Sequence, residues 1–424
     1  MLKLHTEGTG EQAGEIRLSL DELAREGARR MLQAALEAEV AVYLERYQGE
    51  CDGAGHARVV KNGRARPRKL TLGAGTVEIT APRVNDRRVV EGERQRFTSE
   101  ILPPYMRRSP KVAEVLPVLY LRGLSTGDFQ EALPALLGEE ASAGLSPGVI
   151  SRLLSVWEAE YRAFRERDLS ERDYVYIWVD GVHFRIRLEE DRLCALVMIG
   201  VRPDGTKELI AIEDGYRESE ESWASVLRDL KRRGMRSPVL AVGDGALGFW
   251  SALSEVWPET REQQCWVHRL ANVLDKLPKR LQPRAKEALR EIMNAETRAA
   301  AEQGIEEFQE EYGARYPKAV ASLTREQEKL LGYFDFPAEH WKHLRTTNPV
   351  ESTFATVRLR QRTTKGAGSR TRGLVFAYKL LDMASGRWRK QGGSALLPLV
   401  RAGVTFTDGV QVERQDTTER KDAA

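Results

Sequence analysis

The 424-residue chain has few cysteines and no long apolar segment. Its three cysteines, Cys51, Cys194 and Cys265, are widely spaced, which argues against a disulfide framework. No apolar run reaches the ~18 residues of a membrane-spanning helix, and the first residues lack the apolar core of a signal peptide. We therefore expect a cytoplasmic protein that has no membrane partner.

Several catalytic motifs are also missing. The sequence contains no P-loop, no Gly-x-Gly-x-x-Gly after a strand and no Gly-x-Ser-x-Gly. Cys265-x-x-His268 is only half a zinc site, so we expect no structural zinc. The net charge of +3 is mildly basic. Any contact with nucleic acid must therefore come from local basic patches.

The N-terminal part of the chain divides into a helix and a basic module. Ser19 and Glu22 form a capping-box pattern, which predicts one long helix over residues 19–47. From residue 51 to residue 98, Gly and Pro interrupt short β-branched runs that are rich in arginine. This pattern predicts a small β-rich or irregular basic module.

Helix-start signals return between residues 109 and 168. They occur at Ser109-Pro110, at Ser125 or Thr126, and at Ser146-Pro147. The last two helices have the lengths and turn of a helix-turn-helix, which would put Ser151 and Arg152 near the head of the recognition helix. A helical spacer beside a catalytic core is an equally good interpretation.

An α/β block follows. YVYIWVDGVHFRIR, LCALVMIGV and KELIAIEDGY predict three antiparallel strands, followed by a helix, the strand PVLAVG and another helix. This order indicates an α+β fold with a mixed sheet. Residues 269–340 are expected to be wholly helical, and a polar tail follows from Thr405.

Asp180 interrupts the first apolar strand of this block. Bulky residues occupy both faces of the strand, so it is expected to be central and buried, where an unpaired carboxylate is costly. The alternative is a hairpin, because Asp-Gly is a strong turn signal. The apolar pattern continues through Val182, Phe184 and Ile186, which favours a site residue over a turn.

Two further acids have comparable alternatives. Asp244 ends the strand PVLAVG, at the edge where α/β sheets bind ligands, but it also fits a helix N-cap. Glu351 follows Asn348-Pro349-Val350, which fits a capping box. The residues from 357 to 372 include six Lys and Arg and no acid, which suits a phosphate backbone. Together the three acids indicate Mg²⁺-dependent phosphodiester chemistry.

Four segments resemble the Mutator-type transposases of bacterial insertion sequences: WVDGVHFRIR, VGDGALGFW, QQCWVHRLANVLDKLPK and TTNPVESTFATVRLRQRTTKGAGSR. The resemblance implies a DDE-class enzyme with a ribonuclease H-like core. Asp180, Asp244 and Glu351 would be its catalytic, metal-binding triad, holding two Mg²⁺ ions or Mn²⁺ in their place. The implied reaction is hydrolysis at the element ends, then strand transfer by the 3′-hydroxyl. Cys265 and His268 match the family's Cys-x-x-His signature and are expected to shape the active site or handle the DNA end.

The expected partners are terminal inverted repeats and target DNA, bound at the bacterial nucleoid by a homodimer or higher oligomer. Trp266 and Trp341 are candidates for base stacking, although most tryptophans in such a chain are core residues. The cluster from Arg64 to Lys69 is a candidate for phosphate contact, and the alternative is a solvated basic loop. The candidate DNA contacts are Arg64, Arg66, Lys69, Arg152, Arg358, Arg362 and Lys365.

An insertion explains the unequal spacing of the acids, since 64 residues separate the first two and 107 the last two. The expected domains are an N-terminal helix plus basic DNA-binding module (1–105), a helix-turn-helix-like DNA-binding region (106–170), the first part of the catalytic core (171–268), an all-helical insertion (269–340), the second part of the core with the Glu-bearing basic helix (341–395), and a flexible tail (396–424). Two rival hypotheses are a DNA-binding regulator with an inert core and a structure-selective nuclease of the same fold.

Overall fold

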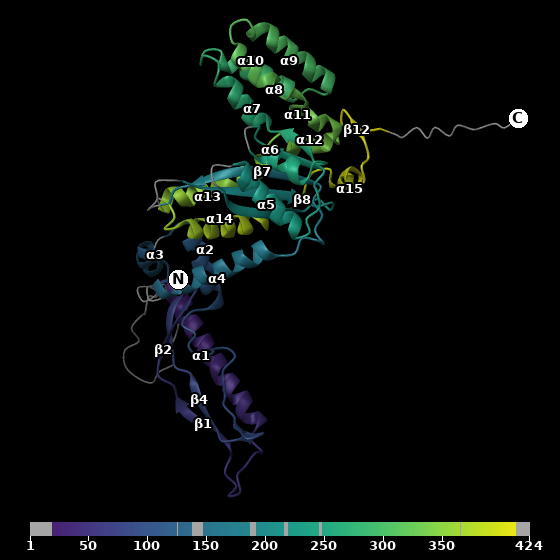
Figure 1. Cartoon of the computed structure of the whole chain (residues 1–424). Helices are drawn as coiled ribbons and strands as arrows, with labels where there is room; N and C mark the ends of the chain where they lie inside the picture. Colours follow the sequence, from purple (N-terminus) through teal and green to yellow (C-terminus); the bar gives the residue numbers. More distant parts are fainter. Residues whose placement is uncertain are drawn as a thin grey trace, which may run out of the picture. The chain divides into compact units, whose positions relative to one another are not determined.

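The computed structural model describes residues 19–124, 126–137, 147–186, 192–215, 219–245, 248–364 and 366–412. The chain divides into two compact units, Met1–Leu153 and Leu154–Ala424, and Figure 1 labels the main elements of both. Among the helices of the described ranges, none has both the length and the apolar character needed to cross a bilayer.

The first unit is organised around the long helix α1 (Leu20–Arg46), which confirms the prediction from its capping box. The Ser19 side chain accepts from the Glu22 backbone N–H, and the Ser19 N–H donates to the Glu22 carboxylate over 2.7 Å. Leu36 of α1 packs with Leu70 and Val77 of a β-hairpin in the core of this unit. The remaining elements are β1 (Val59–Arg64), β2 (Arg68–Leu72), β3 (Gly75–Ile79), β4 (Pro82–Asp86), β5 (Val89–Val90), β6 (Glu93–Arg94), α2 (Pro110–Leu121) and α3 (Thr126–Leu137).

The predicted helix starts are found at Pro110, Thr126 and Pro147. Ser125 and Ser146, the alternative cap positions, lie outside the described residues. Helix α4 (Pro147–Glu166) is a single helix of 20 residues that crosses the division between the units. Its first turns include Arg152, whereas its C-terminal part belongs to the second unit.

A mixed sheet forms the centre of the second unit, which confirms the α+β class. In the described residues it has five strands in the order β11-β10-β7-β8-β9. The first three in sequence, β7 (Tyr176–Phe184), β8 (Leu193–Val201) and β9 (Lys207–Gly215), form the predicted antiparallel meander. Strand β10 (Leu240–Gly243) pairs parallel to β7 on one side. On its other side it pairs parallel to β11 (Arg261–Gln264).

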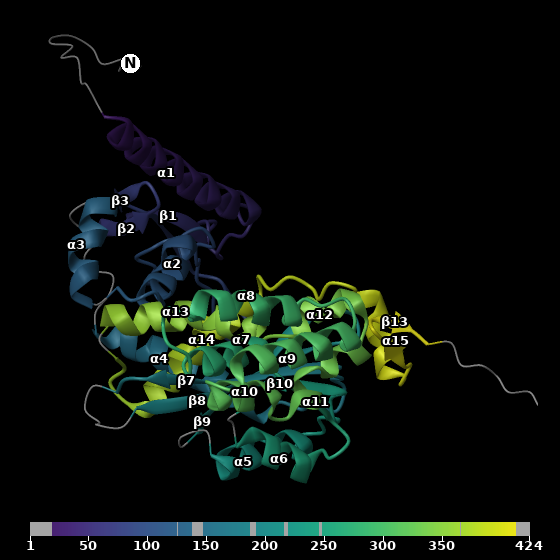
Figure 2. The same cartoon turned by 90° about the horizontal axis from the view of Figure 1, so that it is seen from above.

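Helices cover both faces of this sheet, so its inner strands are apolar on both sides. All nine residues of β8 are buried. On one face Ile177 and Val179 of β7 pack in a core that includes Trp223 of α5 (Glu220–Arg232) and Phe249 of α6 (Phe249–Val256). Figure 2 shows α13 and α14 on the opposite side of the sheet from α5 and α6.

The segment after β11 is helical, as expected, and ends in a packed C-terminal segment that corrects one prediction. A flexible tail is predicted from residue 396, but Leu397, Val400 and Phe406 are buried, and the Gly409 N–H donates to the Phe334 carbonyl. The described part of the predicted tail, up to residue 412, is therefore packed and not flexible. The other elements are α7 (Trp266–Leu274), α8 (Gln282–Met293), α9 (Arg298–Tyr312), α10 (Pro317–Thr324), α11 (Gln327–Leu330), the 3₁₀ helix η2 (Gly332–Asp335), α12 (Ala338–Leu344), α13 (Asn348–Thr364), α14 (Arg370–Ser385), the 3₁₀ helix η3 (Ser394–Leu396), α15 (Leu397–Arg401), β12 (Phe406–Thr407) and β13 (Val410–Gln411).

Candidate functional site

Asp180 lies within β7 and not in a turn. Its pairing partner on β8 is Val197, and the next residue, Gly181, pairs with Leu196. The strand continues to Phe184, so the hairpin alternative is wrong. Val179 and Val182 beside it are buried, whereas Asp180 itself is partly exposed, and its Oδ1 accepts from the Gly181 N–H over 2.8 Å.

The sheet register brings Asp244 next to Asp180. Leu240 pairs with Tyr176 and Val242 with Trp178, so partners on β10 and β7 are 64 positions apart in the sequence. Asp244 is also 64 positions after Asp180. Continued by two residues, the register puts the two acids side by side, with Asp244 just past the carboxyl end of β10 and Asp180 in the middle of β7. The N-cap alternative for Asp244 is wrong, because α6 begins at Phe249 with Gly248 as its N-cap.

The same register extends to the third parallel strand. Gly243 pairs with Gln264, which is 21 positions later, and Cys265 is 21 positions after Asp244. The Cys265 N–H donates to the Gly243 carbonyl over 2.8 Å, which fixes this alignment just past the end of β10. Asp180, Asp244 and Cys265 therefore occupy one level of the sheet.

Strand alternation directs Asp180 to the face that α12 and α13 cover. On that face of β7, the Tyr176 hydroxyl lies 2.8 Å from Nδ1 of His340, and the Trp178 indole N–H donates to the His343 carbonyl over 2.9 Å. Asp180 is two residues after Trp178, so its side chain leaves the strand on the same side. Glu351 lies in the first turn of α13, a helix that packs on β7 and β8.

The local contacts of Glu351 differ from a capping box. Helix α13 starts one residue after Thr347, whose carbonyl accepts from the Val350 and Glu351 N–H groups. The predicted capping box has Asn348 as its N-cap, so the Asn348 N–H would donate to the Glu351 carboxylate. It donates instead to the Thr346 hydroxyl over 3.4 Å. The Thr347 N–H donates to the Cys265 sulfur over 3.3 Å, and the Thr347 hydroxyl lies 2.5 Å from Glu351 Oε1. The carboxylate of Glu351 is 26 % exposed.

Cys265, His268 and Glu351 come together at this place. Their ligand atoms all lie within 4.8 Å of one another, and His268 Nε2 is 3.9 Å from Glu351 Oε1. A hydrogen bond with the Cys265 side chain is the main cause that raises the pKa of His268 to about 9, the charges of Asp244 and Glu351 add to it, and burial opposes the shift. A protonated His268 would add a positive charge beside the carboxylates.

Comparison with known proteins gives a consistent family. The model of "Transposase, Mutator family" matches residues 3–368. The chain belongs to this family. It is 58% identical over 303 residues to the transposase for insertion sequence element IS6120 of Mycolicibacterium smegmatis, covering 72% of this chain and 93% of that protein. It is 48% identical over 290 residues to the transposase for insertion sequence element IST2 of Acidithiobacillus ferrooxidans, covering 66% and 95%.

The candidate DNA contacts of this Mutator-family protein are mostly solvent-exposed. Arg358 and Arg362 are exposed on α13, and Arg152 is exposed on α4. In the first unit, Arg64 forms an ion pair with Glu37 over 2.8 Å. Such half-exposed ion pairs contribute little to the stability of the fold, so Arg64 can exchange Glu37 for a phosphate. Arg66 and Lys69 are exposed, and Lys365 lies outside the described residues.

Both tryptophans that were candidates for base stacking are core residues. Trp266 is fully buried, and its indole N–H donates to the Leu330 carbonyl. Trp341 is 8 % exposed and packs against Phe334. The stacking hypothesis is wrong for both, because each side chain is used to fix the helices that follow β11.

Sequence reasoning missed two buried polar residues around the acids. Thr347 contacts both Cys265 and Glu351, and its only signal is a Thr-Thr pair before Asn348. Arg269, one residue after His268, is 9 % exposed and donates to the Gln264 side chain and the Ser322 carbonyl. Arg269 thus connects β11 with α10, and this contact cannot be predicted from the spacing of residues in the sequence.

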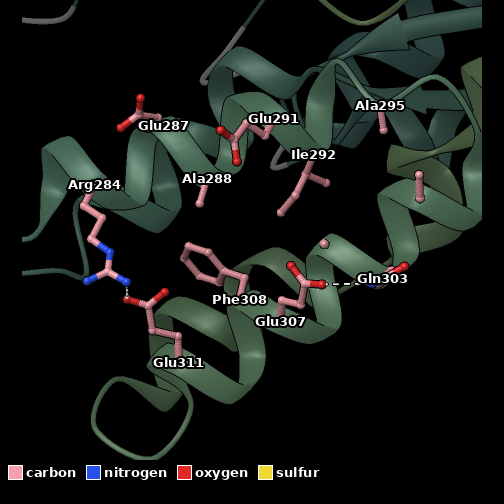
Figure 3. Close-up of a pocket in the computed structure, with 12 residues that line it drawn as sticks. Arg284, Glu287, Ala288, Glu291, Ile292, Ala295, Gln303, Glu307, Phe308 and Glu311 are labelled. Carbon is pink, nitrogen blue, oxygen red and sulfur yellow. Dashed lines mark hydrogen bonds and ion pairs between the residues drawn. The ribbon is translucent and has the colours of Figure 1, made fainter.

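A cavity between α8 and α9 is a separate feature (Figure 3). It has a volume of about 600 Å³, and Phe308 forms part of its wall between two helices that present glutamates. Arg284 forms an ion pair with Glu311 over 3.0 Å, and Glu307 accepts from the Gln303 side chain over 3.0 Å. Glu291 also lines the cavity, whereas the Glu287 carboxylate points away from α9 (Figure 3). Such a surface repels phosphate, and none of the candidate site residues lines it.

Proposed function

We propose that the chain is the transposase of a bacterial insertion sequence, a DNA-cutting and strand-transfer enzyme with a DDE triad. The observation that carries the proposal is the register of β7 and β10, which, continued two residues past the Val242–Trp178 pair, puts Asp244 just after β10 beside Asp180 in the middle of β7. Glu351, on a helix that covers the same face, adds the third carboxylate. Membership of the Mutator family supports this role.

The sheet supports a ribonuclease H-like core. Three antiparallel strands followed by two parallel ones, with helices on both faces, are the form expected of such a core. The helices between β11 and α13 are the proposed insertion, at residues 269–340. The helix-turn-helix assignment of residues 106–170 and the DNA-binding role of residues 1–105 belong to the same proposal.

The donor set fits a divalent metal of the Mg²⁺ type. Carboxylates are the hard oxygen ligands that Mg²⁺ and Mn²⁺ prefer. Asp180, Asp244 and Glu351 would hold the ions, which activate the attacking oxygen and stabilise the leaving one. Cys265 offers a soft sulfur instead, but this sulfur already contacts the backbone and side chain of Thr347. We therefore assign Cys265 to shaping the site and not to ligation.

The chain's own groups would hold and orient the DNA. Glu351, Arg358 and Arg362 are spaced by seven and eleven residues, so they share one side of α13. The two arginines lie roughly 10 and 16 Å from Glu351 along the helix axis. Guanidinium groups in this row can bind successive phosphates and align the scissile bond with the carboxylates. His268, when protonated, would add a donor beside Glu351.

Cleavage of a supercoiled plasmid that carries the element's ends tests the proposal. Wild type and Glu351→Gln are compared in Mg²⁺ and in EDTA. We expect metal-dependent nicking at the ends, which the variant loses while it still binds the ends. Specific binding without cleavage in both proteins would favour the inert regulator. Cutting of branched DNA that lacks the ends would favour the structure-selective nuclease.

A further inference from the structure

Thr347 lies between two side chains that come from different parts of the chain. Its hydroxyl is 3.3 Å from the Cys265 sulfur, at the end of β11, and 2.5 Å from Glu351 Oε1, on α13. Its backbone N–H donates to the same sulfur over 3.3 Å. Thr347 is fully buried and Cys265 is 1 % exposed, so the contacts between them are shielded from water, whereas the Glu351 side chain is 26 % exposed.

The number of protons fixes the direction of the hydrogen bonds. A threonine hydroxyl has one proton and accepts through its lone pairs. A carboxylate is a stronger acceptor than a sulfur atom, so the hydroxyl proton goes to Glu351. The Cys265 S–H then donates to the hydroxyl oxygen, and the Thr347 N–H donates to the sulfur. In this arrangement the Thr347 hydroxyl accepts from Cys265 and donates to Glu351.

We infer that Thr347 is a positioning residue that orients the Glu351 carboxylate for metal binding. The inference rests on the proposed function, because it gives Glu351 the role of a metal ligand. A hydrogen bond to one carboxylate oxygen of Glu351 leaves the other oxygen available to a metal ion. Cys265 acts through Thr347, since its sulfur contacts both the N–H and the hydroxyl of this residue.

A purely structural role for Thr347 would be helix capping. A capping hydroxyl accepts from the N–H of the second or third helical residue. The Thr347 hydroxyl instead donates to a side chain, and the first helical N–H groups are bound by its carbonyl. Removing the hydroxyl therefore leaves the backbone contacts of the helix start in place. This separation makes the positioning role testable.

The test is Mn²⁺ binding to the full chain, followed by electron paramagnetic resonance of the free ion. Thr347→Val keeps the shape and loses the hydroxyl, whereas Thr347→Ser keeps the hydroxyl. The matched control is Thr353→Val, on α13 itself, because the Thr353 hydroxyl donates to the Val350 carbonyl and not to Glu351. Glu351→Gln removes the ligand itself.

We expect Thr347→Val to raise the Kd for Mn²⁺ by about 10-fold or more, the usual effect of removing a group that orients a metal ligand. Thr347→Ser and Thr353→Val should bind Mn²⁺ as wild type does. Unchanged binding by Thr347→Val, with binding lost in Glu351→Gln, overturns the inference and leaves the proposed function intact. Equal weakening in Thr347→Ser and Thr347→Val also overturns it. Wild type that binds no Mn²⁺ would refute the metal assignment of Glu351 and the inference with it.

Discussion

Two adjacent carboxylates at a sheet edge should destabilise the metal-free protein. Neighbouring strands are about 4.8 Å apart, so we expect a separation of roughly 5 Å between the Asp180 and Asp244 carboxylates when the β7–β10 register is continued two residues past Trp178 and Val242. Their repulsion is about 1 kcal/mol in a water-like environment and about 3 kcal/mol at the effective dielectric of a protein surface. Both side chains are partly exposed, so we expect the lower end of this range.

Asp180→Asn removes one charge and retains its local hydrogen bond. An asparagine Oδ1 can still accept from the Gly181 N–H. In EDTA the variant should therefore have a free energy of unfolding about 1 kcal/mol higher than wild type. Divalent metal should reverse the order, since a bound ligand stabilises by about 2.7 kcal/mol at one hundred times its Kd. The variant would gain less because it has lost a ligand.

Urea unfolding followed by tryptophan fluorescence measures this change in the free energy of unfolding for the second unit of the chain, which contains Asp180. All eight tryptophans lie between residues 157 and 388, so the signal reports the second unit. Glu306→Gln, an exposed carboxylate on α9, is the matched control and should change stability by less than about 0.5 kcal/mol. If Asp180→Asn were destabilised to the same extent in EDTA and in Mg²⁺, Asp180 would be a structural residue and the argument would be refuted.

Three further predictions concern stability and DNA binding. Burial, with nearby lysines, lowers the pKa of His343 to about 4, below the ~6.5 of an unfolded histidine. The unfolded state therefore binds more protons, and the free energy of unfolding should fall from pH 6.5 to pH 4 by up to about 1 kcal/mol per pH unit. His343→Gln should flatten this pH dependence in urea titrations, and an unchanged slope would contradict the prediction. Gly200→Ala places a Cβ 2.5 Å from the Ile210 Cδ1 and should cost about 1–3 kcal/mol in the same assay, with normal stability as the contrary result. Arg64→Ala and Arg66→Ala should each weaken DNA binding and reduce its salt slope by about 1 in fluorescence anisotropy, whereas a solvated loop would show no change.

The sequence predicted elements whose signals are local. The capping box of α1 lies within four residues, and the apolar runs of β7, β8 and β9 alternate with short turns. These features depend on neighbours in the chain, so one sequence is enough to find them. The presence of carboxylates in apolar strands was likewise visible, because aspartate is disfavoured there.

Strand β11 was not predicted, for a physical reason. Its sequence, Arg-Glu-Gln-Gln, has no apolar alternation and spans four residues. It is a strand because β10 offers free backbone groups, and Gln263 and Gln264 are buried by side-chain hydrogen bonds to later helices. The contacts of Thr347 are equally non-local, since Cys265 is 82 positions earlier.

The position of Glu351 depends on contacts at the two ends of the helical segment between β11 and α13, and not on the number of residues in that segment. The Trp266 N–H donates to the Arg345 carbonyl over 2.8 Å, and the Cys265 sulfur accepts from Thr347. Both contacts join the residues just after β11 to the residues just before α13. The helices between them leave the sheet and return to the same place, so the entropic cost of closure rises only slowly with their number of residues. Glu351 can thus follow Asp244 by 107 positions and still be held by contacts with Thr347 and, through it, Cys265.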